Sequence, residues 1–379
     1  MIQKTEPIQM SDLIRVRDLS VSFKTRHETI LAVDRLNFEL KENEILGIVG
    51  ESGSGKSQTV LSIMGLLEPN GSATGEANFH GVNLLSLSMS ELNRIRGKEI
   101  GMIFQDPMSS LNPYITIGSQ MSQILAQHTD LTKKEREEKC VEMLDLVGIT
   151  NPQKRFDGYS FELSGGMRQR VMIAMMMLLE PDLLIADEPT TALDVTVQAQ
   201  ILDLLRDIVS DTKIGLILIT HDMGVVAEMA SDVIVLKSGE LVEAGPVQQI
   251  FHAPCAEYTR ALLDAVPSIE TAHPGLPSTE STVILSARNL HKTFRGQRGL
   301  GSAGPKTKAL DDVSLDIRRG ETLALVGESG SGKSTLGRVF LRLAEADQGS
   351  VEFNDLDLLA LTGSQLRLTR YKIQMIFQD

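Results

Sequence analysis

The sequence predicts an α/β protein built around a parallel core sheet, and three observations lead to this prediction. An apolar, strand-like segment runs into the glycine-rich octapeptide GESGSGKS at Gly50–Ser57, and a helical pattern follows it. Later apolar segments alternate with helical patterns, which is typical of parallel strands joined by crossover helices. The same octapeptide returns at Gly327–Ser334, so part of this fold is expected twice.

Composition narrows the class of protein. The chain has 379 residues, of which 42% are hydrophobic, and its net charge is −13 at pH 7. At roughly 150 residues per domain, this length predicts two or three domains. An acidic chain is a poor general binder of nucleic acid, because phosphate binding needs a basic surface.

The chain begins without the apolar core of a signal peptide, and its longest apolar run, Val171–Leu179, is too short to span a bilayer. We therefore expect a cytosolic protein, or one held at a membrane by other subunits.

The first elements in the chain are expected to form an antiparallel β layer. Apolar and polar residues alternate in three short segments, Leu13–Val16, Leu19–Phe23 and Leu36–Leu40. Phe23 has two interpretations that the sequence leaves open, which are core packing and a platform on which an adenine ring stacks. A buried strand over Leu46–Val49 then leads into the octapeptide.

The octapeptide matches the phosphate-binding pattern G-x-x-x-x-G-K-[ST] in the strand-loop-helix context that this pattern requires. Its glycines let the backbone curl with N–H groups pointing inward, and the next helix, expected over Thr59–Leu67, adds a positive dipole end. Lys56 is expected to reach the β- and γ-phosphates of a nucleotide, and Ser57 to bind magnesium.

The middle of the chain is expected to be helical. Apolar residues between Gln120 and Gly148 have helical spacing, and we expect the charged run Lys133–Lys139 to interrupt them as a solvated face. Another helix is expected over Gly166–Leu179, with its methionines filling a core rather than binding a metal. Cys140 and Cys255 lack metal-binding spacing, so we expect two reduced thiols.

Three buried strands are expected next, with helical patterns such as Ala199–Val209 between them: Leu183–Ala186, Ile214–Thr220 and Val233–Leu236. Asp187 and Glu188 follow the first of these strands, and His221 follows the second. Ligands of open α/β sheets bind beyond the carboxyl ends of the strands. We therefore expect the acidic pair and the histidine to face the phosphate loop.

A Pro-, Ser- and Thr-rich stretch at residues 268–282 reads as a linker, after which the pattern restarts. We expect a tail at 1–11, a first domain at 12–267 and a second domain at 283–379. Within the second domain, a strand over Leu323–Val326 is expected to lead into the second octapeptide. Met375–Asp379 repeats Met102–Asp106, where the second copy stops. The expectation is a shortened form of a longer fused protein, whose second domain lacks the acidic pair and the histidine.

Four further segments lie between the first loop and His221: Gln105, LSGGMRQR at Leu163–Arg170, the Asp187–Glu188 pair, and Ala192–Asp194. This ordered set resembles the ATP-binding-cassette (ABC) ATPases, of which LSGG is the signature. The resemblance implies a P-loop NTPase cassette with a parallel core sheet, an antiparallel β layer and a helical subdomain, followed by a partial second cassette.

Longer strings narrow the resemblance. MIFQDPMSSLNP at Met102–Pro113, ADEPTTALDVT at Ala186–Thr196 and the tail Ile250–Pro267 are similar to the double-cassette ATPases of bacterial dipeptide, oligopeptide and glutathione importers. Two departures stand out. Tyr159–Glu162 replaces the usual Tyr-Pro-His-Gln, and Ala256–Glu257 replaces His-Pro before Tyr258. The cysteine cluster of some relatives is missing, so no iron–sulfur cluster is expected.

The resemblance assigns roles to single residues. Mg²⁺ would be held by Ser57, Gln105 and Asp187, while Glu188 polarises the attacking water and His221 contacts the γ-phosphate. Residues of the first cassette expected to bind ATP are Phe23, Gly50, Ser52, Gly53, Ser54, Gly55, Lys56, Ser57, Gln58 and Asp194. The signature residues are expected to cap the ATP of an opposite cassette: Ser164, Gly165 and Gly166. In the second cassette the expected residues are Phe294, Gly327, Gly330, Gly332, Lys333, Ser334 and Thr335, with Ser334 and Gln378 on Mg²⁺.

Partners also follow from the resemblance. Two cassettes would close head to tail around ATP, and since neither composite site is complete in one chain, two first cassettes would pair between chains. Residues after Gln105, including Tyr114, would contact two transmembrane permease subunits at the cytoplasmic face of the inner membrane. A periplasmic solute-binding protein is expected, and nucleic acid is not. Two alternatives stay open, a tandem-cassette ATPase acting on ribosomes or DNA and an inactive remnant. The linker is not long and charged and zinc-binding cysteines are missing, which disfavours the first.

Overall fold

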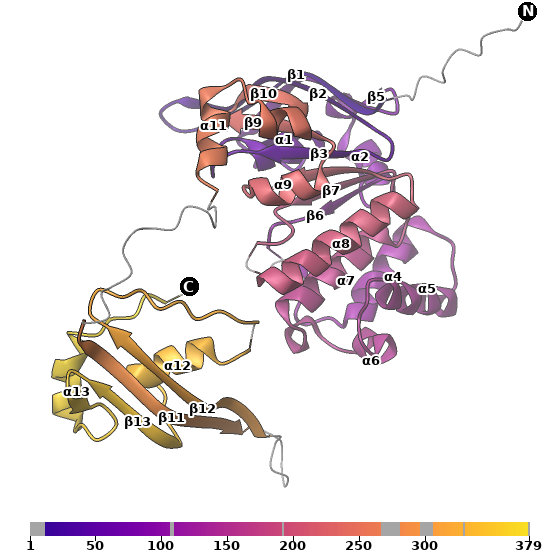
Figure 1. The fold of residues 1–379 in the computed structure, drawn as a ribbon. Helices are drawn as coiled ribbons and strands as arrows, with labels where there is room; N and C mark the ends of the chain where they lie inside the picture. Colours follow the sequence, from indigo (N-terminus) through magenta and orange to yellow (C-terminus); the bar gives the residue numbers. More distant parts are fainter. Residues whose placement is uncertain are drawn as a thin grey trace, which may run out of the picture. The chain divides into compact units, whose positions relative to one another are not determined.

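The computed structural model describes residues 12–106, 110–191, 193–266, 281–295, 306–328 and 330–377. The chain divides into two compact units, Met1–Pro267 and Ser268–Asp379, drawn from indigo to salmon and from orange to yellow in Figure 1. The predicted tail at 1–11 and nearly all of the predicted linker lie outside the described residues.

An antiparallel sheet forms the first layer of the first unit. Its strand order is β2-β1-β4-β5, with β1 at Asp12–Lys24, β2 at Thr29–Lys41, β4 at Gly71–Phe79 and β5 at Val82–Asn83. The prediction of two separate strands within β1 was wrong. The register against β2 shifts between Val16 and Leu19, and Asp18 takes a φ of 46°, so a bulge replaces the expected turn and the strand continues.

The core sheet has the order β10-β9-β3-β8-β7-β6. All neighbouring strands are parallel except β9 and β10. The strands are β3 at Ile45–Val49, β6 at Ile100–Ile103, β7 at Leu183–Asp187, β8 at Gly215–Ile219, β9 at Asp232–Lys237 and β10 at Glu240–Pro246. The predicted parallel sheet is therefore confirmed, and β3, which carries the phosphate loop, lies in its interior.

Both faces of the core sheet are covered, which explains why its strands read as continuous apolar runs. Alternate residues of one strand belong to two different cores: Leu183 and Ile185 pack into the core shared with β1, β2 and β4, whereas Leu184 and Ala186 pack into the core shared with the helices. All five residues of β7 are buried. The sheet therefore holds the carboxyl end of β7 rigidly.

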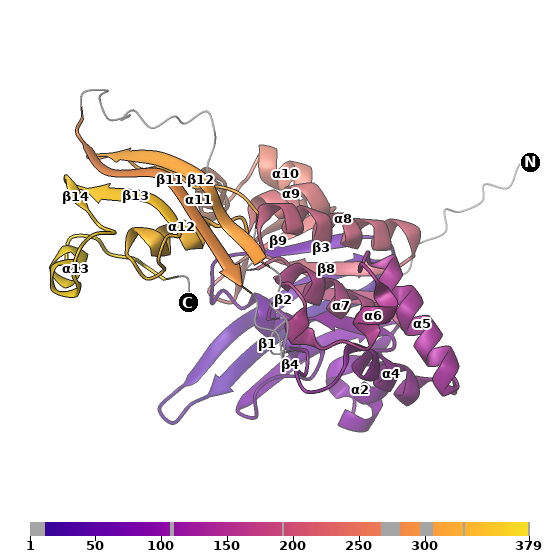
Figure 2. The ribbon, with the colours of Figure 1, turned by 90° about the horizontal axis from the view of Figure 1, so that it is seen from below.

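A group of helices forms a subdomain, visible beside the core sheet in Figures 1 and 2. It consists of α4 at Ile117–His128, α5 at Lys133–Leu146, α6 at Pro152–Phe156 and α7 at Gly165–Met177. The charged run that was expected to interrupt the helices instead begins α5, because Thr132 and Glu135 form a capping box there. Met172 and Met177 of α7 are buried in the core, as predicted.

The other described helices of the first unit lie between these elements or follow its last strand, β10. They are α1 at Lys56–Ile63, η1 at Leu84–Ser86, α2 at Met89–Ile95, η2 at Ser160–Glu162, α8 at Val195–Asp211, α9 at Met223–Met229, α10 at Val247–His252 and α11 at Glu257–Asp264. Within the described ranges, no helix combines the length and apolarity needed to cross a membrane.

The two cysteines differ in accessibility, since Cys140 is buried in α5 and Cys255 is exposed. Burial raises the pKa of the Cys140 thiol to about 11, so it stays protonated at pH 8. We expect iodoacetamide to alkylate the folded protein at one thiol, and Cys255→Ser to remove that reaction. Mass spectrometry of tryptic peptides measures this. Equal labelling of Cys140 without denaturant would contradict its burial.

The second unit repeats the antiparallel layer of the first. Its strand order β12-β11-β13-β14 matches β2-β1-β4-β5, and its elements are β11 at Val283–Arg295, β12 at Lys306–Arg318, α12 at Lys333–Phe340, β13 at Gln348–Phe353, β14 at Leu356–Asp357 and α13 at Gly363–Arg370. The strand expected over Leu323–Val326 is not formed. In the first unit, β3 pairs with β8 and β9. The described residues of the second unit supply neither neighbour, and Val326 is 90% exposed.

Candidate functional site

The phosphate loop Gly50–Ser57 joins the buried strand β3 to α1. Two of its glycines cannot be replaced without a clash. A Cβ on Gly50, where φ is +150°, would lie 2.2 Å from the Leu236 carbonyl oxygen. A Cβ on Gly55, where φ is +99°, would lie 2.4 Å from the Ala32 carbonyl oxygen. Glycine therefore allows the loop to curl tightly against the neighbouring strands.

Lys56 lies inside this loop with only 5% of its surface exposed. Its Nζ donates hydrogen bonds to the carbonyl oxygens of Gly50 at 2.8 Å and Glu51 at 2.9 Å. Burial lowers the pKa of Lys56, and the negative charges of Glu188 and Asp187 oppose this shift. The two hydrogen bonds hold the Lys56 side chain inside the loop, and the charges of Glu188 and Asp187 act on it there.

Asp187, the last residue of β7, meets the first turn of α1. Its Oδ1 accepts a hydrogen bond from Ser57 Oγ at 3.0 Å. Burial raises the pKa of Asp187, while the Ser57 hydrogen bond acts in the opposite direction. The Ser57 hydroxyl and the Asp187 carboxylate, which are far apart in the sequence, therefore lie side by side.

Glu188 stands at the centre of a hydrogen-bonded cluster. Its backbone has a φ of 47°, and its N–H donates to the Ile219 carbonyl of the adjacent strand at 2.9 Å. Its carboxylate accepts from Gln105 Nε2 at 2.8 Å and from Thr191 Oγ1 at 2.8 Å, and lies 3.2 Å from His221 Nδ1. The structure therefore brings together Gln105, Glu188 and His221, which come from the ends of three different strands.

The pKa of Glu188 reflects opposing effects of burial, hydrogen bonds and nearby charges. Burial by itself raises its pKa, but hydrogen bonds from Thr191 and His221, with the charges of His221 and Lys56, outweigh burial and leave the pKa below its ordinary value. The carboxylate is therefore ionised at neutral pH. Sequence reasoning missed Thr191. The available signal was a threonine three residues after a carboxylate at a strand end, where side chains bond locally.

The side chains that the resemblance assigns to the metal suit a hard divalent cation. The Ser57 hydroxyl, the Asp187 carboxylate and the Gln105 amide oxygen are the ligand types that Mg²⁺ takes beside substrate phosphates. Gln105 uses its Nε2 on Glu188, which leaves its Oε1 as an acceptor. These residues fit Mg²⁺, although the described residues contain no group of three or more His, Cys, Asp or Glu that could hold a metal.

The signature residues lie at the start of α7. Ser164 caps this helix by accepting from the Met167 N–H at 3.3 Å, and Ser164 itself is exposed. A Cβ on Gly166 would lie 2.3 Å from Val197 Cγ1, so glycine permits the close contact of α7 with α8. Asp194 caps α8 through the Val197 N–H at 3.0 Å. In the part of the chain that is described, no hydrogen bond joins Ser164 to the Gly50–Ser57 loop.

The two candidate adenine platforms differ. Phe23 pairs with Gly71 across the β1–β4 ladder, and its half-buried ring packs against the core. Phe294 of β11 is 47% exposed, with Lys292 Nζ 5.5 Å from its ring centroid. Phe23 therefore contributes to core packing, whereas the Phe294 side chain is exposed to solvent with Lys292 over its ring.

The second phosphate loop is formed in the same way as the first. Lys333 Nζ donates to the carbonyl oxygens of Gly327 at 2.6 Å and Glu328 at 2.7 Å, but this lysine is more exposed than Lys56. Ser334 and Thr335 lie in the first turn of α12, and two loop glycines, Gly330 and Gly332, take left-handed φ values. Gln378 lies outside the described residues, so its predicted metal role has no structural description.

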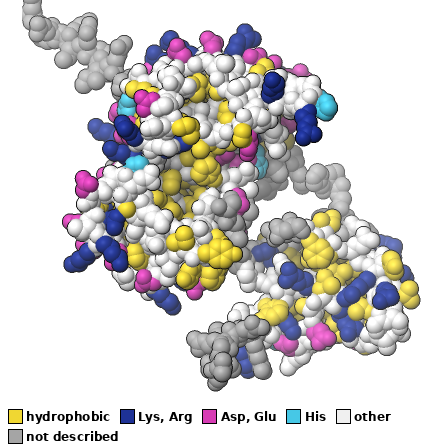
Figure 3. All heavy atoms as spheres, turned by 180° about the vertical axis from the view of Figure 1, so that it is seen from behind, with side chains coloured by type: hydrophobic (Ala, Val, Ile, Leu, Met, Phe, Trp, Pro, Cys, Tyr) yellow, Lys and Arg dark blue, Asp and Glu magenta, His cyan; other side chains and the backbone are white. Residues whose placement is uncertain are grey.

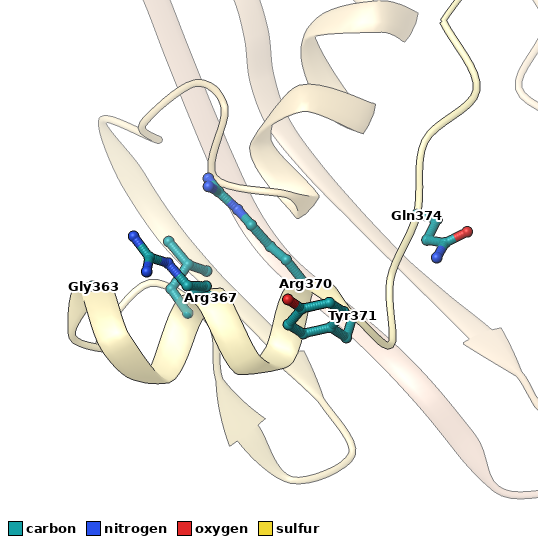
Figure 4. Close-up of a pocket in the computed structure, with 6 residues that line it drawn as sticks. Gly363, Arg367, Arg370, Tyr371 and Gln374 are labelled. Atoms are coloured by element: carbon teal, nitrogen blue, oxygen red, sulfur yellow. The ribbon is translucent and has the colours of Figure 1, made fainter.

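Two pockets have no role that the sequence predicts. One, of about 430 Å³, lies beside α13 and is lined by Gly363, Leu366, Arg367, Arg370, Tyr371 and Gln374 (Figure 4). Arg370 there donates to the backbone carbonyls of Leu341 and Arg342, so it fastens α13 to the end of α12. The other, of about 350 Å³, is apolar and is lined by Met102, Phe104, Ser110, Leu111, Met172, Met175 and Met176.

Two known families match parts of this chain. The family described as "ABC transporter" matches residues 33–191 and 310–379. The family described as "Oligopeptide/dipeptide transporter, C-terminal region" matches residues 242–298.

Curated relatives include the "Glutathione import ATP-binding protein GsiA" of Shigella flexneri and of Escherichia coli O157:H7. The chain is 43% identical to each over an alignment of 406 positions. These alignments cover 99% of the chain and 65% of each relative, so the chain spans less than two thirds of their length.

Solved structures of ABC cassettes are similar in fold to the greater part of this chain. One is a "dimeric structure of a post-hydrolysis state of the ATP-binding cassette MJ0796 bound to ADP and Pi", with a TM-score of 0.56 and 28% identity, covering 62% of this chain and 98% of that one. Another is cbiO1 from Clostridium perfringens, with a TM-score of 0.54 and 27% identity, covering 68% of this chain and 96% of that one. The predicted α/β P-loop fold is thereby confirmed.

Proposed function

The chain belongs to the ABC transporter family, and from that premise we propose that it is the ATP-binding and ATP-hydrolysing subunit of an importer for peptides, whether dipeptides, oligopeptides or glutathione. One observation carries the catalytic part of this proposal. The ionised Glu188 carboxylate is bonded to Gln105 and His221, and its charge interacts with Lys56 of the phosphate loop. The match to the oligopeptide/dipeptide transporter region supports peptides as the cargo.

The residues divide the work of phosphoryl transfer. Loop N–H groups and the Lys56 ammonium bind the β- and γ-phosphates. Ser57, Gln105 and Asp187 would hold Mg²⁺, which neutralises charge on the transferred group. Glu188 accepts a hydrogen bond from the attacking water and so orients it, while His221 keeps the carboxylate in place.

A second cassette completes the proposed site. Ser164 and Gly166 start a helix of 13 residues, whose N-terminal N–H groups favour an anion. Ser164 is exposed and not bonded to the loop of its own chain, which supports a role opposite the nucleotide of another cassette, in a head-to-tail dimer. The dimeric MJ0796 cassettes are similar in fold to this unit.

Membrane partners are proposed from residues that lie close to Gln105 in the sequence. Phe104, next to Gln105, lines the apolar pocket, and Tyr114 shortly after it is 89% exposed. Figure 3 shows hydrophobic side chains gathered across the middle of the larger unit. We infer that the segment containing Phe104 and Tyr114 contacts two permease subunits at the cytoplasmic face of the inner membrane. A periplasmic solute-binding protein would deliver the cargo, and nucleic acid has no place in this scheme.

Peptide uptake tests the proposal. In the source bacterium, deletion of the gene should abolish uptake of at least one of three labelled cargoes: a dipeptide, an oligopeptide or glutathione. The unaltered gene should restore uptake, and Lys56→Ala should not. Uptake of a free amino acid serves as the control. Unchanged uptake of all three peptides in the deletion strain would contradict the proposal.

A further inference from the structure

The last helix of the first unit reaches back to the phosphate loop. Tyr258, the second residue of α11, accepts a hydrogen bond on its Oη from the N–H of Glu51 at 3.3 Å. This tyrosine lies within residues 242–298, the segment that matches the oligopeptide/dipeptide transporter C-terminal region. A segment outside the nucleotide-binding motifs therefore contacts the loop itself.

One peptide group connects Tyr258 to Lys56. The peptide between Gly50 and Glu51 offers its carbonyl to Lys56 Nζ at 2.8 Å and its N–H to Tyr258 Oη at 3.3 Å. A planar trans peptide points these two groups in opposite directions. Fixing the N–H therefore also fixes the carbonyl that receives the lysine, and each hydrogen bond polarises the other.

Tyr258 is itself held in place. Lys237 Nζ, at the end of β9, lies 4.6 Å from the centroid of the tyrosine ring. The start of α11 is fastened to β10, because the Glu243 carboxylate accepts from the N–H groups of Cys255 at 2.7 Å and Ala256 at 3.1 Å. Burial raises the pKa of Tyr258, so its hydroxyl stays protonated at neutral pH. The phenol is a fixed, neutral partner of the loop.

We propose that Tyr258 is a positioning residue of the phosphate loop, which holds the Gly50–Glu51 peptide so that its carbonyl orients Lys56 toward a bound triphosphate. Through it, the C-terminal segment of the first unit sets nucleotide affinity. This inference rests on the proposed function, because it requires ATP to bind at this loop. Tyr258 acts on the nucleotide through Lys56 and does not touch it.

Affinity of the full chain for a non-hydrolysable ATP analogue tests the proposal. Tyr258→Phe removes only the hydroxyl and keeps the ring under Lys237. Loss of one hydrogen bond predicts an affinity about 2- to 10-fold weaker. Tyr371→Phe, at an exposed tyrosine of the second unit, is the matched control and should bind as the unaltered chain does. Thermal unfolding of both variants should match that of the unaltered chain.

A double-mutant cycle separates positioning from a general structural effect. If Tyr258 acts through Lys56, Tyr258→Phe weakens binding in the unaltered chain and changes nothing further in Lys56→Ala. An equal loss in both backgrounds, or no loss in either, overturns the positioning role. A failure of the proposed function would give a different result: the unaltered chain would not bind the analogue, or Lys56→Ala would bind it as well as the unaltered chain does.

Discussion

Replacing Glu188 by glutamine is expected to slow ATP turnover by about 10²- to 10⁴-fold, the range measured for loss of a positioned acid–base group. Glutamine keeps the size of the side chain and its contacts with Gln105 and Thr191, but it removes the charge that orients the attacking water. ATP affinity should remain, since Lys56 and the loop N–H groups bind the phosphates.

Phosphate release and equilibrium ATP binding, measured on the same preparation, check this expectation. Glu180→Gln is a suitable control because that carboxylate is exposed and pairs only with Lys139 in the described residues. The pKa of Glu188 is lowered, so protonation of this carboxylate should not limit turnover of the unaltered chain until pH passes below the usual glutamate range. A Glu188→Gln variant with normal turnover would remove this residue from the mechanism.

Lys56→Ala is expected to weaken ATP binding by about 10- to 100-fold, as the loss of a charged hydrogen-bond donor predicts. The substitution also frees the carbonyls of Gly50 and Glu51, which the ammonium now orders. Titration with a fluorescent ATP analogue measures the affinity. Lys333→Ala provides the matched comparison, because it changes the same position of the second loop. A larger loss from Lys333→Ala than from Lys56→Ala would place the principal nucleotide site in the second unit instead.

The sequence was most informative where buried strands end in polar residues. β7 and β8 read as apolar runs because both of their faces are covered, and their carboxyl ends had to lie at one edge of the sheet. This reasoning anticipated that Glu188 and His221 would meet. The glycine spacing of the phosphate loop was equally direct, because φ values such as +99° at Gly55 exclude most other residues.

Other features depend on long-range contacts that periodicity does not encode. At Asp18 a bulge stands where a turn between two strands was expected, so β1 is continuous. This bulge is defined by the pairing of β1 with β2, which lies elsewhere in the sequence. Leu323–Val326 has the apolar pattern of a strand, but a strand needs partners, and none lies beside it among the described residues. Tyr258 and Glu51 are in contact although 207 residues separate them in the sequence. Composition and spacing could not predict it, because a single hydroxyl leaves no pattern in sequence.

The most direct test of the nucleotide site is a crystal structure of the Glu188→Gln chain with ATP and Mg²⁺. It should show the triphosphate wrapped by Gly50–Ser57, with the γ-phosphate beside Lys56 and within reach of residue 188 and His221. A triphosphate bound elsewhere in the first unit, or a γ-phosphate remote from His221, would contradict the assignment of these residues to ATP hydrolysis.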